Sequence, residues 1–229
     1  MDFPIRIFGT IEITDNVTFY ITETLVVTWI IIAALIAFAL VVRIKLKKWE
    51  MMARPSGLQN FVEFTVETFE KFFKSSSSPK VSYLTPWFFT LFVFLLISNM
   101  IGVTGLRPPT ADWGMTFPLA VTSFLLMQFA GLRHRPKNYF KSFFEPVFIF
   151  FPLNVVGELA KPVALSFRLF GNVLAGVILI SLLYGMAPLL FRLGFPVFLH
   201  AYFDIISGLL QAFIFTVLSI TFVGLAAED

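Results

Sequence analysis

Long uncharged apolar stretches constrain this chain more than any other feature of its sequence. The first, Leu25 to Val42, has about 18 residues, enough for about 27 Å of helix. Hydrophobic residues make up 58% of the chain and charged residues only 14%, against about 25% charged in an average soluble domain. One water-soluble core cannot bury so much apolar surface, so we predict an all-α integral membrane protein.

We expect one membrane domain over residues 1–229, with about five transmembrane helices and one interfacial amphipathic helix. The predicted spans are 25–42, 84–103, 117–132, 145–190 and 196–227, and the interfacial helix is 57–74. The last two spans exceed the about 20 residues that a perpendicular helix needs. We therefore predict that they form a hairpin of long, steeply tilted helices.

Basic residues are distributed unevenly between the predicted loops. Two clusters follow the first and third spans: Arg43, Lys45, Lys47 and Lys48, and then Arg133, Arg135, Lys137 and Lys141. The opposite side receives only Arg6, Arg107 and Arg192. This asymmetry predicts an N-terminus outside and a C-terminus in the cytoplasm. The residues before the first span lack a basic n-region, so we expect no cleavable signal peptide. A bacterial plasma (inner) membrane fits best, and an organelle-encoded origin stays open.

An arginine lies near the middle of the fourth predicted span, 145–190. If this helix runs from about Leu153 to Tyr184, its midpoint is near Arg168. The midpoint of the fifth span, 196–227, falls near Gln211, which predicts the same depth for both side chains. A mid-membrane arginine costs at least about 2.5–3.5 kcal/mol and keeps its charge, so water or a counter-charge must meet it.

Further polar side chains line the same two spans. Asn172 is one helical turn after Arg168, while Asp204, Ser207 and Gln211 share a helical face. Glu158 and Lys161 lie toward the cytoplasm, and Asp204 lies toward the outside.

Plainer roles for these residues remain open. Arg168 can form a structural ion pair with Asp204 or Glu158, Glu158 can simply pair with Lys161, and Asn172 and Gln211 can serve only to bond helices together. His200 lies near the outer interface, where we expect it to be solvated.

This pattern predicts two offset polar paths separated by a fixed positive charge. Ions can enter each path but cannot cross the block without a mobile carrier. A carboxylate on another subunit fits that role, since it would take up an ion on one side and release it near Arg168 on the other.

Three segments resemble subunit a of F-type rotary ATP synthases. They are GELAKPVALSFRLFGNVLAG (Gly157 to Gly176), the QAFIF stretch from Gln211 with Leu218, and PPTADWGMTF (Pro108 to Phe117). The resemblance covers most of the chain and implies an ion-translocating stator subunit of the Fo sector. Its expected partners are the c-ring, the b subunits of the peripheral stalk and the lipid bilayer.

The resemblance implies that Arg168 is the essential ion-coupling arginine, and that Asn172 and Gln211 match the family's polar residues on the last two helices. Two half-channels would carry protons, or Na⁺ in some members, to and from the ring. Ion flow would thereby drive ATP synthesis. Two positions depart from many bacterial relatives: Val177 replaces a glutamate, and Asp204 replaces a histidine. The coupling ion therefore stays open.

Other function classes fit the sequence less well. An independent secondary transporter should show paired broken helices and a substrate pocket. A purely structural assembly subunit would leave the polar residues in the spans without a purpose. No phosphate-binding loop or nucleophile–base arrangement is visible, so we expect no catalytic site and no direct ATP binding. We also expect no cofactor, no nucleic-acid partner and no metal site beyond transient Na⁺.

Overall fold

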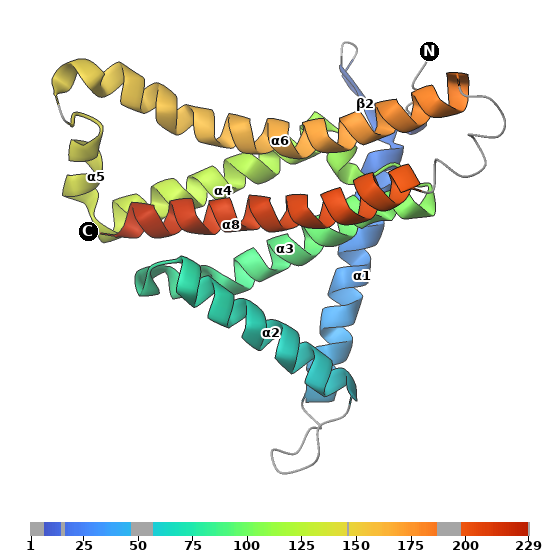
Figure 1. Ribbon diagram of the computed structural model, residues 1–229, viewed down its shortest axis with the longest axis horizontal. Coiled ribbons are helices and arrows are strands. Elements are labelled where there is room, and N and C mark those ends of the chain that lie inside the picture. Colours follow the sequence, from blue (N-terminus) through green and yellow to red (C-terminus); the bar gives the residue numbers. More distant parts are fainter. Residues whose placement is uncertain (1–6, 15–16, 47–56, 146, 187–197, 229) are drawn as a thin grey trace. The chain divides into compact units, whose positions relative to one another are not determined.

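The computed structural model describes residues 7–14, 17–46, 57–145, 147–186 and 198–228 (Figure 1). The basic residues Arg6, Lys47, Lys48 and Arg192 of the predicted loops lie outside these ranges. The chain divides into two compact units. The first unit comprises Met1–Lys48, Phe94–Asp112 and Gly171–Leu209, and the second comprises Trp49–Val93, Trp113–Phe170 and Leu210–Asp229.

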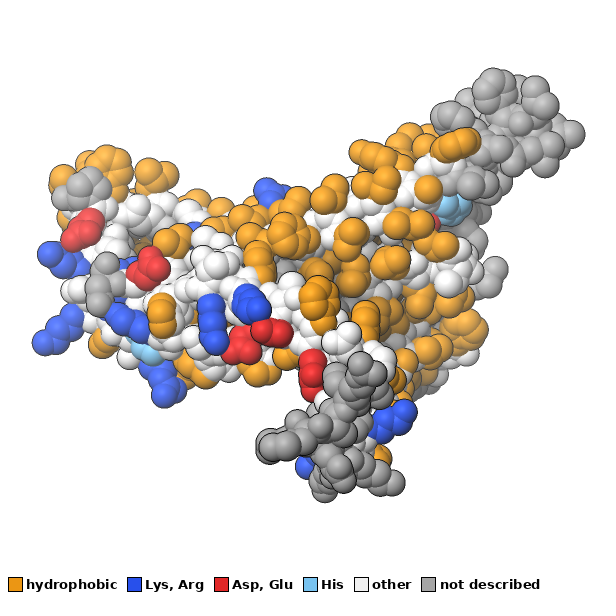
Figure 2. All heavy atoms as spheres, turned by 60° about the horizontal axis from the view of Figure 1, so that its bottom comes forward, with side chains coloured by type: hydrophobic (Ala, Val, Ile, Leu, Met, Phe, Trp, Pro, Cys, Tyr) orange, Lys and Arg blue, Asp and Glu red, His pale blue; other side chains and the backbone are white. Residues whose placement is uncertain are grey.

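Five helical stretches are long and apolar enough to cross a membrane, as the sequence predicted. They are Glu23–Lys45, Pro79–Thr104, Trp113–His134, Phe148–Leu183 and Phe198–Ala227. In the apolar segment of each stretch, at most 50% of the residues are buried within the protein itself. Figure 2 shows hydrophobic side chains covering much of the face in view. A helical protein with this exposed apolar surface requires lipid as its solvent.

The first unit begins with an antiparallel hairpin that the sequence analysis did not predict. Strand β1 (Ile7–Thr14) pairs with β2 (Val17–Thr22), with Thr10 opposite Tyr20. Helix α1 (Glu23–Leu46) follows directly. Its first turn carries Glu23 and its last turn Arg43 and Lys45, charges that complement the helix dipole.

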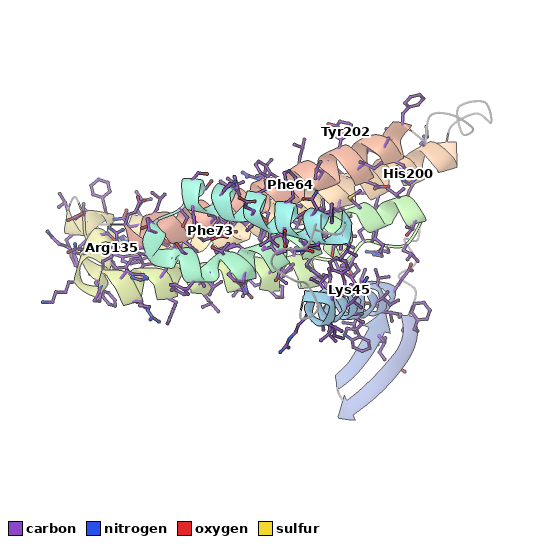
Figure 3. All side chains as sticks on the ribbon, turned by 90° about the horizontal axis from the view of Figure 1, so that it is seen from below. Lys45, Phe64, Phe73, Arg135, His200 and Tyr202 are labelled. Carbon is purple, nitrogen blue, oxygen red and sulfur yellow. The ribbon has the colours of Figure 1, made fainter. Side chains whose placement is uncertain are left out.

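The second unit contains the predicted interfacial helix as α2 (Gly57–Ser76). Phe73 is fully buried on this helix, whereas Phe64 is 67% exposed (both labelled in Figure 3). Charged side chains between the aromatic ones form one-turn ion pairs, such as Lys71 with Glu67 at 2.8 Å. An amphipathic helix with exposed phenylalanines is typical of a segment lying in the membrane interface.

Tight 3₁₀ turns flank the helices of the middle spans. Turn η1 (Pro79–Leu84) leads into α3 (Thr85–Met100), and η2 (Ile101–Thr104) ends at Gly105. Gly105 adopts φ 79°, a left-handed conformation in which glycine avoids a Cβ clash. Turn η3 (Pro109–Ala111) precedes α4 (Trp113–His134), and the short helix α5 (Pro136–Ser142) occupies the predicted second basic loop.

The last two spans are the longest. After turn η4 (Phe148–Phe150), α6 runs over Phe151–Met186 and contains Pro162, which removes the backbone donor that would otherwise reach the Glu158 carbonyl. The final span starts at Phe198, becomes the π-helical segment η5 (Ala201–Ser207) and continues as α8 (Gly208–Ala227). Such π segments occur frequently at functional sites. The tilt and hairpin arrangement of these spans stay predictions.

Candidate functional site

Arg168 lies on α6 in the second unit, with its residue exposed. Its neighbours Leu165, Ser166 and Leu169 are at most 5% exposed, and Phe167 is 55% exposed. The Ser166 hydroxyl lies 3.3 Å from the Thr116 hydroxyl of α4. Among the described residues of its unit, Arg168 has no hydrogen-bond or ion-pair partner. The guanidinium is therefore on the unburied side of the helix, free to meet a group from outside the unit.

Two predicted residues meet in the first unit. The Ser207 hydroxyl on η5 donates a 2.8 Å hydrogen bond to the Asn172 side-chain oxygen on α6. One turn further along α6, a Cβ added to Gly176 would lie 3.0 Å from Phe203. The two helices are therefore in close contact here, and Asn172 and Ser207 bond across that contact.

Asp204 has a partner that the sequence analysis set aside. One carboxylate oxygen, Oδ2, lies 2.6 Å from Nδ1 of His200, four residues earlier. The His200 side chain is 37% exposed and that of Asp204 15% exposed, so His200 is partly exposed while it also contacts the carboxylate. The one-turn spacing between a histidine and an aspartate was the signal available in the sequence.

A cavity of about 490 Å³ opens beside this pair within the first unit. Its charged or titratable lining residues are Glu23, Arg107, His200 and Asp204. Arg107 forms a 2.8 Å ion pair with Asp112, and its backbone N–H donates a 3.4 Å hydrogen bond to Glu23. The cavity therefore offers several polar groups and is roomy enough to hold several waters.

Asn99 of α3 is a second residue whose role the sequence analysis missed. It is 2% exposed, and its amide donates a 2.9 Å hydrogen bond to the Gly208 carbonyl, where η5 ends. Its side-chain oxygen accepts a 2.8 Å hydrogen bond from Thr110. The amide thus ties three segments of the first unit together at the end of the π segment.

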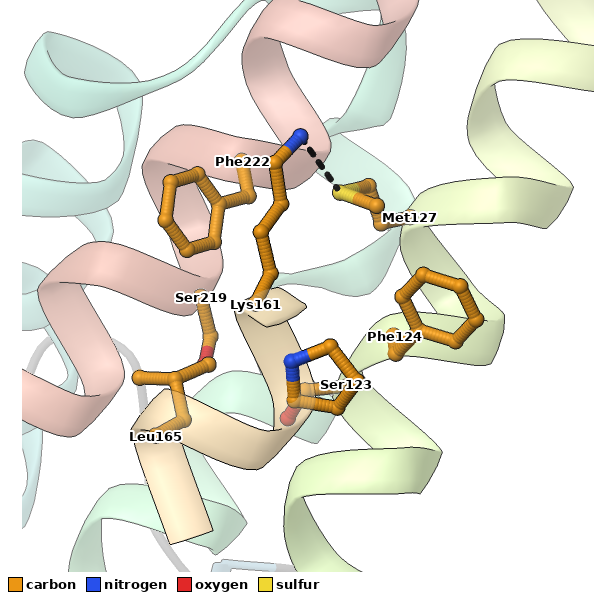
Figure 4. Close-up of a pocket in the computed structure, with 8 residues that line it drawn as sticks. Ser123, Phe124, Met127, Lys161, Leu165, Ser219 and Phe222 are labelled. Atoms are coloured by element: carbon orange, nitrogen blue, oxygen red, sulfur yellow. Dashed lines mark hydrogen bonds between the residues drawn. The ribbon is translucent and has the colours of Figure 1, made fainter. Parts of the chain in front are cut away.

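Glu158 and Lys161 form a close pair in the second unit. The Lys161 ammonium lies 2.5 Å from Oε1 of Glu158, within one turn of α6. The same ammonium lies 4.0 Å from the Met127 sulfur and 5.3 Å from the centre of the Phe222 ring (Figure 4). The other carboxylate oxygen of Glu158 is buried with no hydrogen-bond partner among the described protein atoms.

A cavity of about 130 Å³ adjoins this ion pair within the second unit. Its lining includes Arg135 and Tyr139 as well as Glu158 and Lys161. Arg135 (labelled in Figure 3) donates hydrogen bonds to the carbonyls of Ala226 and Leu225, which satisfies the end of α8. The Tyr139 hydroxyl donates to Gln128, and burial, followed by the Glu158 charge, raises the pKa of Tyr139 to about 12.

Gln211 lies on α8 in the second unit and is 6% exposed. Its amide nitrogen has no hydrogen-bond partner among the described protein atoms. The predicted common depth of Gln211 and Arg168 stays a prediction. Within the described ranges, no group of three His, Cys, Asp or Glu residues is arranged to hold a metal ion.

These observations define a class of protein: a multi-pass helical membrane protein with polar cavities and a free cation along its apolar spans. Residues 25–224 match the sequence profile of the family described as ATP synthase A chain. The chain therefore belongs to the ATP synthase subunit a family, and the predictions of family, helical membrane fold and ion-translocating role in the Fo sector are confirmed. Members are components of the ion-translocating complex and not its catalytic subunit.

Individual relatives are similar in sequence to this chain over most of their length. ATP synthase subunit a of Moorella thermoacetica is 36% identical over 206 residues, covering 89% of this chain and 90% of the relative. Subunit a 2 of Syntrophotalea carbinolica is 34% identical, with 88% and 84% covered. The subunit a of Propionigenium modestum, described as sodium ion specific, is 35% identical, with 90% and 74% covered.

Proposed function

We propose that this chain is the stator subunit that carries ions to and from a ring of c subunits, and that Arg168 is the charge on which the coupling depends. Membership in the subunit a family supports the role. The observation that carries the residue assignment is the exposed, unpaired guanidinium within the candidate span Phe148–Leu183. A cation in that position attracts an ionised ring carboxylate and blocks ion leakage past it.

The first-unit cavity is proposed as the outer half-channel. It is lined by Asp204 and by residues of the loop around Arg107, which the positive-inside pattern assigns to the outside. Asn172 and Ser207 extend polar groups from this region along α6 and η5. A carboxylate and a chain of hydroxyl and amide groups lower the cost of a cation in the membrane.

The second-unit cavity is proposed as the inner half-channel. It is lined by Glu158, Lys161 and residues of the second basic loop, which the same pattern assigns to the cytoplasm. The paired Glu158 and Lys161 supply polar groups at the side of α6, and the buried Gln211 amide offers a donor without a partner in its unit. A cavity with two cations and one carboxylate binds a cation weakly, which favours release.

The proposed assembly includes the c-ring and the b subunits of the peripheral stalk. We propose the plasma membrane of a bacterium as its location, with the N-terminus outside and the C-terminus in the cytoplasm. An independent secondary ion transporter, the alternative raised by the sequence, is not favoured, because the family match spans residues 25–224. One 35% identical relative is described as sodium ion specific, so membership in the family does not by itself decide between H⁺ and Na⁺.

The decisive experiment replaces Arg168 with alanine in the assembled ATP synthase and measures ATP synthesis driven by an ion gradient in membrane vesicles. We expect Arg168→Ala to abolish coupled synthesis while the complex still assembles, because the ring carboxylate loses its counter-charge. Arg133→Ala is the matched control, since Arg133 lies in the last turn of α4, where its guanidinium is 5.6 Å from the Tyr83 ring centre. Normal coupled synthesis in the Arg168 variant would contradict the proposed function.

A further inference from the structure

The imidazole of His200 is in direct contact with the carboxylate of the first-unit cavity. Its Nδ1 lies 2.6 Å from Oδ2 of Asp204, and both residues line the cavity. The His200 side chain is the more exposed of the two, at 37% against 15%. The imidazole is therefore the more accessible member of a pair that lines the cavity.

Gly102 lies close to the Asp204 carboxylate, and both residues line the cavity. A Cβ added to Gly102 would lie 2.9 Å from Cγ and from Oδ1 of Asp204, closer than real Cβ contacts allow. The absence of a side chain in η2 thus makes room for the Asp204 carboxylate. The Asp204 carboxylate therefore lies close to both the Gly102 backbone and the His200 ring, and it lines the cavity together with His200.

The other charged groups of the cavity are already engaged. Arg107 is paired with Asp112 at 2.8 Å, and the Glu23 carboxylate accepts the backbone N–H of Arg107. Val177, Ile180 and Ser181 contribute α6 side chains that carry no charge. Among the described lining residues, His200 and Asp204 therefore form the one pair of titratable groups bonded directly to each other.

Building on the proposed function, we propose that His200 is an ion-pathway residue that relays protons to Asp204, so that the first-unit cavity conducts protons and not Na⁺. The neutral ring takes a proton from cavity water at Nε2 and becomes imidazolium. The imidazolium then releases its Nδ1 proton to Oδ2 of Asp204, leaving a neutral ring and a protonated carboxyl. Asp204 then gives this proton to water that leads to the ring carboxylate. The imidazole loses its Nε2 proton to water and regains one from water at Nδ1, which restores the starting tautomer.

The chemistry of the pair separates protons from sodium. Imidazole is the side chain that most readily gains and loses a proton near neutral pH. Hard monovalent and divalent cations prefer oxygen ligands, as carboxylates, carbonyls and water supply. Na⁺ would have to bind a carboxylate that His200 already contacts at Oδ2, and the imidazole adds no oxygen ligand, whereas a proton uses the hydrogen bond as its path.

The test uses the complete ATP synthase in sealed vesicles and measures ATP-driven proton uptake per ATP hydrolysed. We expect His200→Ala to lower proton transport about tenfold, less than the about 100-fold typical of a positioned acid or base, because water keeps part of the path. Imidazole added to the buffer should restore transport in this variant. Since the alanine leaves space beside a cavity of about 490 Å³, free imidazole has room to bind.

The chain provides its own matched control. Its two histidines are His134 and His200, and His134 lies at the end of α4 in the second unit. His134→Ala should transport at the normal rate with or without imidazole. His200→Gln retains a hydrogen-bond donor toward Asp204 but cannot relay a proton, so it should assemble normally and still transport slowly. This variant decides the question if His200→Ala fails to assemble.

Three outcomes would overturn the relay. They are normal proton transport in His200→Gln, a loss in His200→Ala that imidazole does not restore, and ATP-driven uptake of radioactive Na⁺ by the unmodified complex. The Arg168→Ala variant measured in parallel separates the two proposals. If Arg168→Ala abolishes coupling while the His200 variants behave normally, the relay is wrong and the stator function stands. If Arg168→Ala remains coupled, the proposed function itself fails.

Discussion

The two units each contain a polar cavity at an ionised side chain, but the cavities differ in size and in the sign of their charge. The first-unit cavity measures about 490 Å³ and is lined by the carboxylates Glu23 and Asp204 with one arginine. The second-unit cavity measures about 130 Å³ and is lined by Arg135 and Lys161 with one carboxylate. An excess of negative groups favours cations, and an excess of positive groups disfavours them.

The state of the carboxylate differs as well. Asp204 contacts an imidazole, a partner that can itself gain or lose a proton, whereas Glu158 contacts the ammonium of Lys161. An aspartate–histidine pair can exchange protons, but a glutamate–lysine pair mainly keeps its charges in place. The comparison therefore predicts unequal roles: the first-unit carboxylate takes part in ion transfer, and the second-unit carboxylate mainly neutralises a cation.

Neutralising the two carboxylates in turn tests this difference most severely. We expect Asp204→Asn to lower ATP-driven ion transport about 100-fold, because an amide cannot accept the transferred proton. Glu158→Gln should lower it no more than about fivefold, equivalent to the about 1 kcal/mol that a partly exposed ion pair contributes. The measurement is ion uptake in vesicles, normalised to ATP hydrolysis. Equal losses in the two variants would remove the proposed distinction between the cavities.

Hydropathy alone predicted the membrane spans, because lipid requires about 20 apolar residues in a continuous helix. Elements that depend on partners were harder to predict. The hairpin of β1 and β2 was missed because an isolated two-stranded sheet is marginally stable in water. Helix α5 is only 7 residues long, and the basic residues in and around it are typical of a loop, so the sequence analysis assigned this segment to a loop. The π geometry of η5 depends on tertiary packing and has no simple sequence signal.

The candidate site was predictable as a set of residues but not as a set of contacts. Arg168, Asn172, Asp204 and Ser207 stood out because polar residues are rare in apolar spans. The bond between Asn172 and Ser207 depends on how two helices are rotated against each other, which hydropathy does not define. His200 was assigned to solvent from its depth alone, although its one-turn spacing to Asp204 indicated the pair.

Buried hydrogen bonds offer a smaller test, on stability. Asn99→Leu should lower the free energy of unfolding by about 1–3 kcal/mol, because the Gly208 carbonyl and the Thr110 hydroxyl lose their partner. In the second unit, Ser166→Ala should cost only about 0.6 kcal/mol, the average for hydrogen bonds between membrane helices. Unfolding in detergent measures both. If Ser166→Ala lowered the free energy of unfolding more than Asn99→Leu, the prediction would be wrong, because the buried Asn99 amide would then contribute less than the Ser166 hydroxyl.

The smallest expected effect concerns Tyr139. If its phenol ionised, the second-unit cavity would hold a further negative charge. Burial raises the pKa of Tyr139 from 10.0 to about 12, with a further contribution from Glu158. Absorbance titration of the protein against its Tyr139→Phe variant should therefore show this phenol ionising near pH 12. A phenol that ionises near pH 10.0 would contradict its burial beside Glu158.

The same shift predicts how stability depends on pH. The contribution of Tyr139 is fully present below pH 10.0 and is lost as the pH rises toward 12, since the unfolded chain releases the phenolic proton first. Between about pH 9 and about pH 11, the unmodified protein should lose more stability than Tyr139→Phe. At neutral pH the phenol is uncharged, so the charges of the second-unit cavity come from Arg135, Glu158 and Lys161. Equal losses in both proteins would mean that the cavity accommodates a phenolate, and the contrast in charge between the two units would weaken.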